Sequence, residues 1–513
     1  MKKPSFTQSM SLLHTWGGLV LGWLLFVIFL SGSLAVFDQE IDNWMHPELP
    51  VAEVEQAHAA QVALDYLKQR HPEQTAWRIS LPGERTDQLS VSVGEGRRNA
   101  EAQFLDPRSG EPLASRKSTG GYFFFSFHFL LNLPVLLGIW TTGFAAVAML
   151  VALVSGIVIH KKIFKDFFTF RPAKGQRSWL DVHNVTGVLM LPFHLMIAYT
   201  ALSIFAMIYM PAGVHSVFNG DNKAFTQQMY GGQRFGGPQV PKERGEPAPG
   251  ADIAEVLVRA REVLGPVTDL SIGNPGYSTA RIQARASMGN TVELTKGRTA
   301  VFDGVTGELL EPPTPTARRT LFTQRVMTGL HFAQFGGYPV RWLYFICGMA
   351  SCVMIATGLV IFTLKRRRAS EQTKTFAYRV YRSAEHLNVA IVAGLIVACG
   401  ALLWSNHLLP AQLAERSDWE QRVFFGIWLL TLLHAFLRPW RKAWCEQLCL
   451  AAVLCLGLPL LNAFVDGQAH HPWLEGTSVG FGLILLRIAR RVANPPAEVP
   501  ARKRKSEATE VTP

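Results

Sequence analysis

Histidines recur inside long stretches of the chain that carry no charged side chain. His183 and His194 both lie in the stretch 182–220, which contains no Asp, Glu, Lys or Arg. A helix turns by about 100° per residue, so eleven steps place both rings within about 20° of one face and about 16 Å apart in depth. Ionisable side chains inside a membrane are costly and usually mark function, and imidazole is a common ligand of haem iron. We therefore predict an inward-facing histidine stripe that binds a cofactor in a helical bundle.

Three histidines gather near one end of the expected membrane spans, which we assign to the cytoplasmic face. They are His14, His160 and His183. We favour His14 and His183 as a pair of haem ligands, with His160 as a competing ligand. Gly17-Gly18 follows the first member of the pair and Thr186-Gly187 follows the second, so small residues would leave room for a wide macrocycle.

A second group of histidines lies near the external ends of the spans. We favour His128 and His331 as the outer haem pair, with His194, which lies between the two groups, as a competing ligand or a relay. A single histidine in a span is more often a hydrogen-bonding core residue than a ligand. Two groups on different helices favour haem over that interpretation.

The remaining histidines and the cysteines favour structural roles. Three histidines lie on later spans, four in the external regions without a metal-binding pattern, and two in a loop: His386, His407, His434, His46, His58, His71, His215, His470 and His471. All six cysteines lie in or beside apolar segments, so the external regions have no disulfide framework, and the cysteine spacing does not predict zinc.

The elements that would hold these histidines are membrane helices. About 20 mostly apolar residues span a bilayer, and neither 342–364 nor 122–160 contains a charged side chain. The uncharged run 4–37 is too long for a signal peptide and predicts a retained first span. Eight spans are expected, at about 10–37, 134–160, 182–209, 340–364, 386–409, 421–437, 446–465 and 473–490.

The net charge of +12 is distributed beside the apolar segments and not over a soluble face. Lysines and arginines cluster in 161–181, 365–382 and the C-terminal tail, which marks these segments as cytoplasmic. Both termini are then cytoplasmic, and a nucleic-acid partner is excluded. The chain has no Gly-x-Gly-x-x-Gly motif, Walker loop or nucleophile elbow, so electrons would come from a separate cytoplasmic reductase or a membrane quinol.

Two external regions resemble each other and predict a small α+β module used twice. The first contains an expected helix and two strands, Ala57–Arg70, Trp77–Leu81 and Gln88–Val93, and the second contains Ile253–Leu264, Ala280–Ala284 and Thr291–Leu294. Each region then has an Asp-x-x-Ser/Thr-Gly-Glu turn, in 103–113 and in 300–310, in which Asp caps the turn and Gly takes the positive φ.

The membrane segments repeat as well. Phe127-His128-Phe129 follows the first module and Leu330-His331-Phe332 follows the second. The returning spans then carry similar steps, Ser155-Gly-Ile-Val-Ile-His160 and Thr357-Gly-Leu-Val-Ile-Phe362. The repeating unit is an outward helix, an external module and a returning helix.

Three segments resemble the PepSY-associated transmembrane family: Leu13-His-Thr-Trp-Gly-Gly-Leu19, Ser155-Gly-Ile-Val-Ile-His-Lys-Lys162 and Leu180-Asp-Val-His-Asn-Val-Thr-Gly-Val-Leu-Met-Leu-Pro-Phe-His194. The Asp-containing turns resemble those of the PepSY module itself. The resemblance covers about residues 8–366. It implies an inner-membrane ferric-siderophore reductase that holds two b-type haems and reduces Fe(III) to Fe(II), in a siderophore or another chelate, on the periplasmic side. Residues 381–491 depart from the compact four-span form of that family.

The expected fold is a polytopic α-helical membrane protein with two PepSY-like periplasmic modules, in a bacterial inner membrane and in contact with its lipids. The expected boundaries are 1–37 for the first transmembrane helix, 38–120 for the first module, 121–210 for the second and third helices with the cytoplasmic loop 161–181, 211–325 for the second module, 326–366 for the fourth helix, 381–491 for about four further helices, and 492–513 for a basic disordered tail. The alternative function is a non-enzymatic sensor or protease regulator that binds peptides or partners externally. A transporter is disfavoured because the first five spans lack acidic residues.

Overall fold

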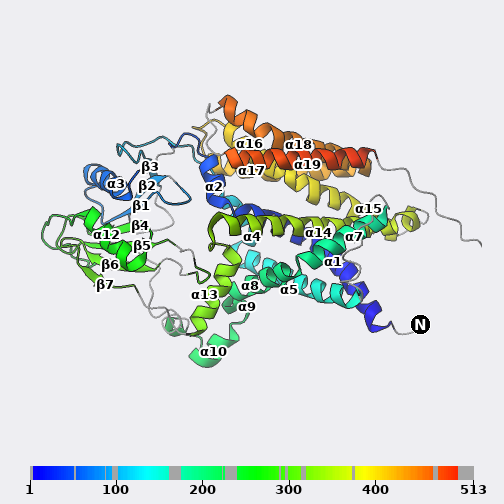
Figure 1. Cartoon of the computed structure of the whole chain (residues 1–513), viewed down its shortest axis with the longest axis horizontal. Coiled ribbons are helices and arrows are strands. Elements are labelled where there is room, and N and C mark those ends of the chain that lie inside the picture. Colours follow the sequence, from blue (N-terminus) through cyan, green and yellow to red (C-terminus); the bar gives the residue numbers. More distant parts are fainter. Residues whose placement is uncertain are drawn as a thin grey trace, which may run out of the picture.

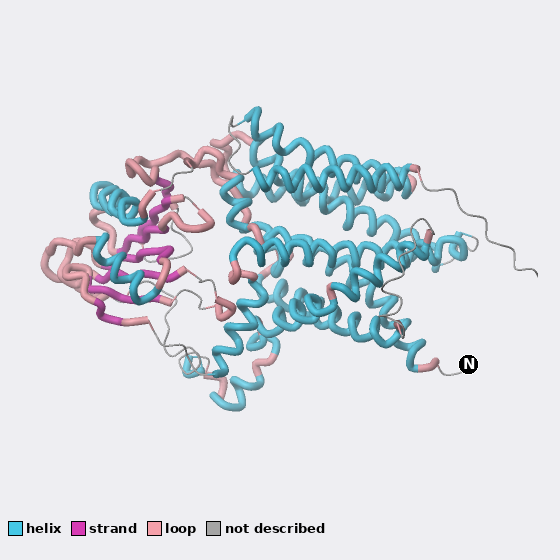
Figure 2. Tube along the Cα trace, viewed as in Figure 1, coloured by secondary structure: helices cyan, strands magenta, loops and turns pink. Residues whose placement is uncertain are grey.

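The computed structural model describes residues 4–494 apart from 51–53, 87, 95–101, 161–174, 222, 226–237, 239, 288–290, 295–297, 314–318, 372–375 and 466–471. Most of the expected basic loop 161–181, the pair His470-His471 and the tail from residue 495 onward lie outside the described residues. The described chain is a bundle of long helices with one β-sheet beyond one end, and the N-terminus lies at the other end (Figure 1). All strands lie in this outer part, as the colouring of Figure 2 makes plain.

Five helices within the described residues are long and apolar enough to cross a membrane. They are α1 (Phe6–Ala35), α5 (Val135–Ile159), α14 (Gly337–Glu371), α18 (Trp440–Val465) and the continuous run of α15 (Phe376–Asn388), the π-helical turn η1 (Val389–Ala393) and α16 (Gly394–Leu408). Their inward faces share one apolar core, which contains Leu25, Leu30 and Leu359. These helices make the chain a multi-pass helical membrane protein.

A sixth candidate span is broken in the middle. The helices α7 (Gln176–Leu189) and α8 (Leu191–Ile204) meet at Met190 and are bent by 63°. Pro192 lies in the first turn of α8, where its missing N–H and its ring oppose a continuous helix. The prediction of one straight third helix, with His183 and His194 on the same face, is therefore wrong.

Two further long helices complete the C-terminal part of the chain. They are α17 (Arg416–Leu437) and α19 (Pro472–Ala493), and both run beside α16 and α18 (Figure 1). Both are long enough to cross a membrane but are less apolar than the candidate spans, because each carries several charged residues. By length and composition, the described residues contain five candidate spans, or six if the bent pair is one span.

The two external regions form one sheet. Its seven antiparallel strands have the order β3-β2-β1-β4-β5-β6-β7, so each region contributes a continuous half. The strands are β1 (Ala76–Ser80), β2 (Leu89–Val93), β3 (Gln103–Leu105), β4 (Val267–Gly273), β5 (Arg281–Ala286), β6 (Thr299–Asp303) and β7 (Leu309–Glu311). The helices α3 (Gln56–Arg70) and α12 (Ile253–Leu264) pack on it through a shared apolar core.

Both halves confirm the expected helices and most of the strands. The strand that sequence reasoning missed is β4, which pairs with β1 and joins the halves. The expected strand Thr291–Leu294 is wrong, because these residues form no strand and Leu294 N instead donates to Arg325 O. An isolated external module would leave β1 or β4 as an open edge, so fusion of the halves removes two exposed edges.

The repeated turns have the same geometry. Asp106 accepts backbone hydrogen bonds from Arg108 and Ser109 at 2.7 and 3.3 Å. Asp303 accepts bonds from the N–H groups of residues 305 and 306 at 2.9 and 3.1 Å. The glycines that follow have φ values of +75° and +70°, so the turn assignment is confirmed at both places.

Further helices connect the candidate spans with the sheet along the chain. They are α2 (Asp38–Trp44), α4 (Tyr122–Leu130), α9 (Ala206–Tyr209), α10 (Ala212–Phe218) and α13 (Arg319–Phe332). Of these, α4 and α13 carry the two outer histidines and are equivalent in the repeat. The broken backbone after each one includes residues with positive φ, Leu131 and Ala333, which end the helices before the next span begins.

Candidate functional site

The first pair of histidines lies near the N-terminal end of the bundle, on two different helices. His14 of α1 and His183 of α7 have ring centroids 6.3 Å apart. The Nδ1 atom of His14 lies 2.9 Å from Ala152 O, and that of His183 lies 2.8 Å from Met354 O. A carbonyl oxygen only accepts, so each Nδ1 carries the proton and each Nε2 keeps its lone pair. This is the tautomer required of a histidine that ligates metal through Nε2.

Each ring of this inner pair rests on a glycine. A Cβ atom at Gly156 would lie 3.2 Å from His14 Cε1, and one at Gly358 would lie 3.1 Å from His183 Cε1. In both cases the hydrogen-bonded carbonyl lies four residues before the glycine on the same helix. The repeated Ser-Gly and Thr-Gly steps are therefore sockets that orient the two rings.

The second pair lies on the short helices at the sheet end of the bundle. His128 of α4 and His331 of α13 have ring centroids 6.1 Å apart. His128 Nδ1 donates to Ile28 O at 2.8 Å, and a Cβ atom at Gly32 would lie 2.6 Å from the ring. The glycine again follows the carbonyl by four residues, so this is a third copy of the socket.

His331 has a different partner. Its Nδ1 lies 3.0 Å from Thr200 Oγ1, and that hydroxyl donates to Met196 O at 2.7 Å. Because the single hydroxyl proton points to Met196, Thr200 accepts the bond from His331. The Nε2 atom of His331 keeps its lone pair, so all four paired rings have the same tautomer.

The spacing of both pairs fits one metal ion between two imidazoles. A bond from a transition metal to imidazole nitrogen is about 2 Å and the nitrogen is about 1 Å from the ring centre, so two axial rings need centroids about 6 Å apart. No group of three or more His, Cys, Asp or Glu that could hold a bare ion occurs among the described residues. Two imidazoles suffice for haem iron, because the macrocycle supplies the other ligands.

Space beside the rings is consistent with a wide ligand. The four paired histidines are only partly covered by protein, whereas His194 is fully buried. A Cβ atom at Gly17 or Gly18, in the turn after His14, would meet no atom within 4 Å. The inner pair therefore has room for a macrocyclic group on the side of Gly17 and Gly18, and the two imidazoles of each pair are spaced to bind one metal ion.

The two competing histidines have other partners. Asn184 Nδ2 lies 2.7 Å from His160 Nε2 and donates to it, which engages the nitrogen that would bind metal. His194 Nε2 lies 2.8 Å from Ser351 Oγ, and that hydroxyl donates to Cys347 O at 2.7 Å. The Nε2 atom of His194 therefore carries the proton, and its buried Nδ1 has no hydrogen-bond partner. This tautomer is the reverse of that in the four paired rings.

The histidines of the later helices each contact other protein groups. His386 Nδ1 donates to Ala435 O at 2.6 Å, and its ring stacks on Phe436. His434 Nε2 lies 2.8 Å from Glu446, and the ring of His407 packs edge-on against Trp44 at 4.5 Å. None of the three forms a histidine pair of the kind described above within the described residues.

A charged cluster joins the β1–β2 hairpin to α2 and α14. Arg85, in the β1–β2 hairpin, binds Glu40 through Nε and Nη2 at 2.8 and 2.6 Å and Asp38 at 3.1 Å. Burial opposes ionisation of Glu40, but the hydrogen bonds and charge of Arg85 prevail and hold its pKa below the ordinary value. Burial raises the pKa of Asp38, which receives a single hydrogen bond from Arg85. Tyr338 at the start of α14 donates to Glu40 at 3.1 Å, so the cluster ties the sheet to the bundle.

Sequence reasoning identified the four paired histidines but missed most of what orients them. Thr200, Gly32 and the carbonyl of Ile28 had no motif of their own. The repeat supplied a signal for the inner sockets, since the Ser155-Gly and Thr357-Gly steps are alike. Thr200 stands where the other three sockets have a glycine, so the repeated Ser-Gly and Thr-Gly pattern did not point to it.

The fold and the paired sites define a class: a multi-pass helical membrane protein with two histidine pairs, one at each end of its bundle, and an attached β-sheet. A sequence profile described as the PepSY-associated TM region matches residues 11–366, about two thirds of the chain, so the protein belongs to that family. The match runs from α1 to α14 and includes all six candidate histidines, while α15 to α19 lie beyond it. No curated protein matches the chain.

Proposed function

We propose that this protein carries electrons across a bacterial inner membrane through two b-type haems and reduces a ferric siderophore, or a similar Fe(III) chelate, at the periplasmic face. The observation that supports this most is the pair of bis-histidine arrangements at opposite ends of one bundle. Their centroid spacings of 6.3 and 6.1 Å agree with each other and with the spacing at which two imidazoles would hold one iron ion. A bound haem b would supply one-electron transfer at each position.

The proposed topology follows from charge. Arg366 and Arg367 lie at the end of α14 beside the inner pair, where Arg366 packs over Phe362 at 3.9 Å. Such residues favour the cytoplasmic side. The N-terminus is then cytoplasmic and the sheet, with its two PepSY-like halves, is periplasmic. Counting α7–α8 as one span and adding α17 and α19 gives eight spans and a cytoplasmic C-terminus.

Each histidine pair would have a separate task. His14 and His183 would hold the haem that accepts electrons from a quinol or a cytoplasmic reductase. His128 and His331 would hold the haem nearest the sheet, next to the substrate. Ferric iron in a siderophore is bound by hard oxygen ligands, which hold ferrous iron far less firmly, so gain of one electron loosens the chelate. His194 lies between the pairs and is retained as a candidate relay.

A reduced-minus-oxidised spectrum of the purified protein tests the proposal. We expect b-type bands with two haems per chain, and His14→Leu and His128→Leu should each remove one of them. His215→Ala, at an exposed site in α10, is the matched control and should keep both. A protein without b-type bands, or with bands unchanged in both ligand variants, contradicts the proposal.

A second candidate function is a non-enzymatic sensor or protease regulator that binds an extended peptide. The edge strand β7 favours it, because all three of its residues are exposed and an open edge can pair with another strand. This function predicts that the four paired histidines can be replaced without loss of peptide binding. Glu311→Pro should then abolish binding measured with fluorescent peptides, and Glu308→Ala should not.

A further inference from the structure

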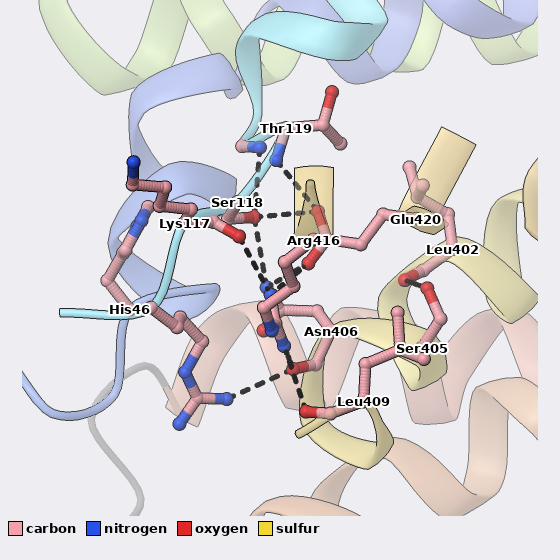
Figure 3. A network of polar contacts seen from close by, with 12 residues as sticks. His46, Lys117, Ser118, Thr119, Leu402, Ser405, Asn406, Leu409, Arg416 and Glu420 are labelled. Atoms are coloured by element: carbon pink, nitrogen blue, oxygen red, sulfur yellow. Dashed lines mark hydrogen bonds and ion pairs between the residues drawn. The ribbon is translucent and has the colours of Figure 1, made fainter. Parts of the chain in front are cut away.

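A buried carboxylate in α17 joins the C-terminal helices to the segment that precedes α4 (Figure 3). Glu420 and Arg416 are both 0% exposed and form an ion pair. Glu420 Oε2 accepts hydrogen bonds from Ser118 Oγ and Thr119 N at 2.9 and 2.7 Å, and Oε1 accepts one from Asn406 Nδ2 at 2.9 Å. A buried charge is tolerated only when it is paired and hydrogen-bonded. Arg416 of the same helix supplies the opposite charge, and two of the hydrogen bonds come from residues 118–119.

The arginines extend this contact along the segment. Arg416 Nη1 donates to Lys117 O at 3.2 Å, and Arg416 also donates to Asn406 O. Arg116 Nη1 donates to that same carbonyl at 3.1 Å, and its Nε donates to Glu48 at 2.8 Å. Four successive residues, 116–119, are therefore bound to α16 and α17.

An apolar contact continues the same stripe of α17. Arg416, Glu420 and Phe424 are four residues apart and share one helix face. Phe424 is 0% exposed, and its ring lies 4.9 Å from Phe123 and 5.4 Å from Phe127 of α4. Phe127 directly precedes His128, so this contact ends next to a member of the outer pair.

The helix that receives these contacts needs outside support. It has nine residues and no side-chain cap at its N-terminus, and so short a helix does not persist by itself. Its repeat partner α13 has 14 residues and is held by the segment between β5 and β6, where Glu293 binds Arg325 at 3.3 Å and Leu294 N donates to Arg325 O at 3.2 Å. The two equivalent helices therefore have different supports.

We infer that α16 and α17 are a positioning element for α4, in which Glu420 and Phe424 fix the segment 116–130 and so set the orientation of His128. The C-terminal helices would thereby control the outer haem and leave the inner one unaffected. The support of α4 stands on the contacts alone, while its effect on a haem rests on the proposed function.

The experiment uses the full-length protein in lipid nanodiscs, with Glu420→Ala, Phe424→Ala and the control Glu446→Ala. The control removes a partly exposed ion-paired carboxylate from α18. We expect hydrogen–deuterium exchange in 117–130 to rise about tenfold or more in both test variants, with no change in 322–332. The electron paramagnetic resonance signal that His128→Leu removes should shift in these variants, and the other haem signal should not. Glu420→Gln keeps one carbonyl acceptor and should show a smaller effect.

The outcomes are separable. Unchanged exchange in 117–130, or equal shifts of both haem signals, overturns the inference. Faster exchange at 117–130 in a protein that carries no haem supports the role of α17 in holding α4 and refutes the proposed function. If the alanine variants do not accumulate, Phe424→Leu keeps part of the apolar contact, and a smaller rise in exchange, again confined to 117–130, is expected of it.

Discussion

The two histidine pairs are held in different ways. The inner pair lies on candidate membrane spans, on α1 and on the first half of the broken span α7–α8, and both rings rest on glycine sockets of α5 and α14. The outer pair lies on α4 and α13, which are not among the candidate spans, and one of its rings is held by Thr200 in place of a glycine socket. The bundle core alone orients the inner pair, whereas the outer pair depends on contacts from the sheet and the C-terminal helices. The outer pair should therefore respond more strongly to single substitutions.

The largest effect is expected at the socket of His128. In Gly32→Ala the new methyl group would lie 2.6 Å from the ring, so the imidazole or α4 must move. A displacement of about 1 Å at a reactive group lowers rates by about a hundredfold. We expect loss of the outer haem, seen as half the haem content per chain. The rate of Fe(III) reduction should fall by about a hundredfold.

The control for this change is Gly480→Ala on α19, where a Cβ atom would meet nothing within 4 Å. It should retain both haems and full activity. Normal haem content in Gly32→Ala would show that the outer ring tolerates movement, and the contrast between the pairs would then be unfounded.

A smaller effect is expected at the hydroxyl that orients His331. Thr200→Val keeps the shape of the side chain but removes the acceptor for Nδ1. Partners of this kind contribute about tenfold to hundredfold to metal affinity. We expect the outer haem to be lost about tenfold faster in a competition assay with apomyoglobin, while the inner haem is retained. Thr141→Val, on the exposed face of α5, is the matched control.

A smaller effect still is expected at the inner socket. In Gly358→Ala the methyl group would lie 3.1 Å from His183 Cε1, a contact that a shift of a few tenths of an ångström relieves. We expect both haems to remain bound, with a changed midpoint potential for the inner one alone. Redox titration measures the two midpoint potentials separately. If Gly358→Ala loses the inner haem while Gly32→Ala keeps the outer one, the inner pair is the more sensitive of the two.

Much of this contrast was accessible from the sequence. Apolar length predicted α1, α5 and α14, and residue type together with the repeat predicted which histidines gather at each end. The pairings His14–His183 and His128–His331 required no helix geometry, only their position near the span ends. The 6.3 and 6.1 Å centroid distances agree with these pairings.

What the sequence did not predict depends on contacts between distant segments. The bend at Met190 follows from Pro192, yet proline in the first turn of a helix is also common without a bend. The β1–β4 pairing joins residues about 190 positions apart, and no periodicity within either module encodes it. Glu420 lay in a weakly apolar segment, and its partners at 118–119 are contributed by a loop some 300 residues earlier.

The smallest effect is expected from the charged cluster that ties the sheet to the outer end of the bundle. Arg85 holds the pKa of Glu40 below its ordinary value against the opposing effect of burial. A carboxyl group with a lowered folded-state pKa contributes stability above its unfolded pKa of about 4.3, and this contribution disappears as the pH falls through the lower folded value. In Glu40→Gln, the free energy of local opening of residues 83–86, measured by hydrogen exchange at pH 7, should therefore fall by about 1–3 kcal/mol.

The wild-type protein should lose this advantage below about pH 4, and both haem signals of the variant should stay unchanged at neutral pH. Equal resistance of the two proteins at pH 7 would mean that the cluster does not hold the hairpin, and the outer end would then depend on α13 and α17 alone.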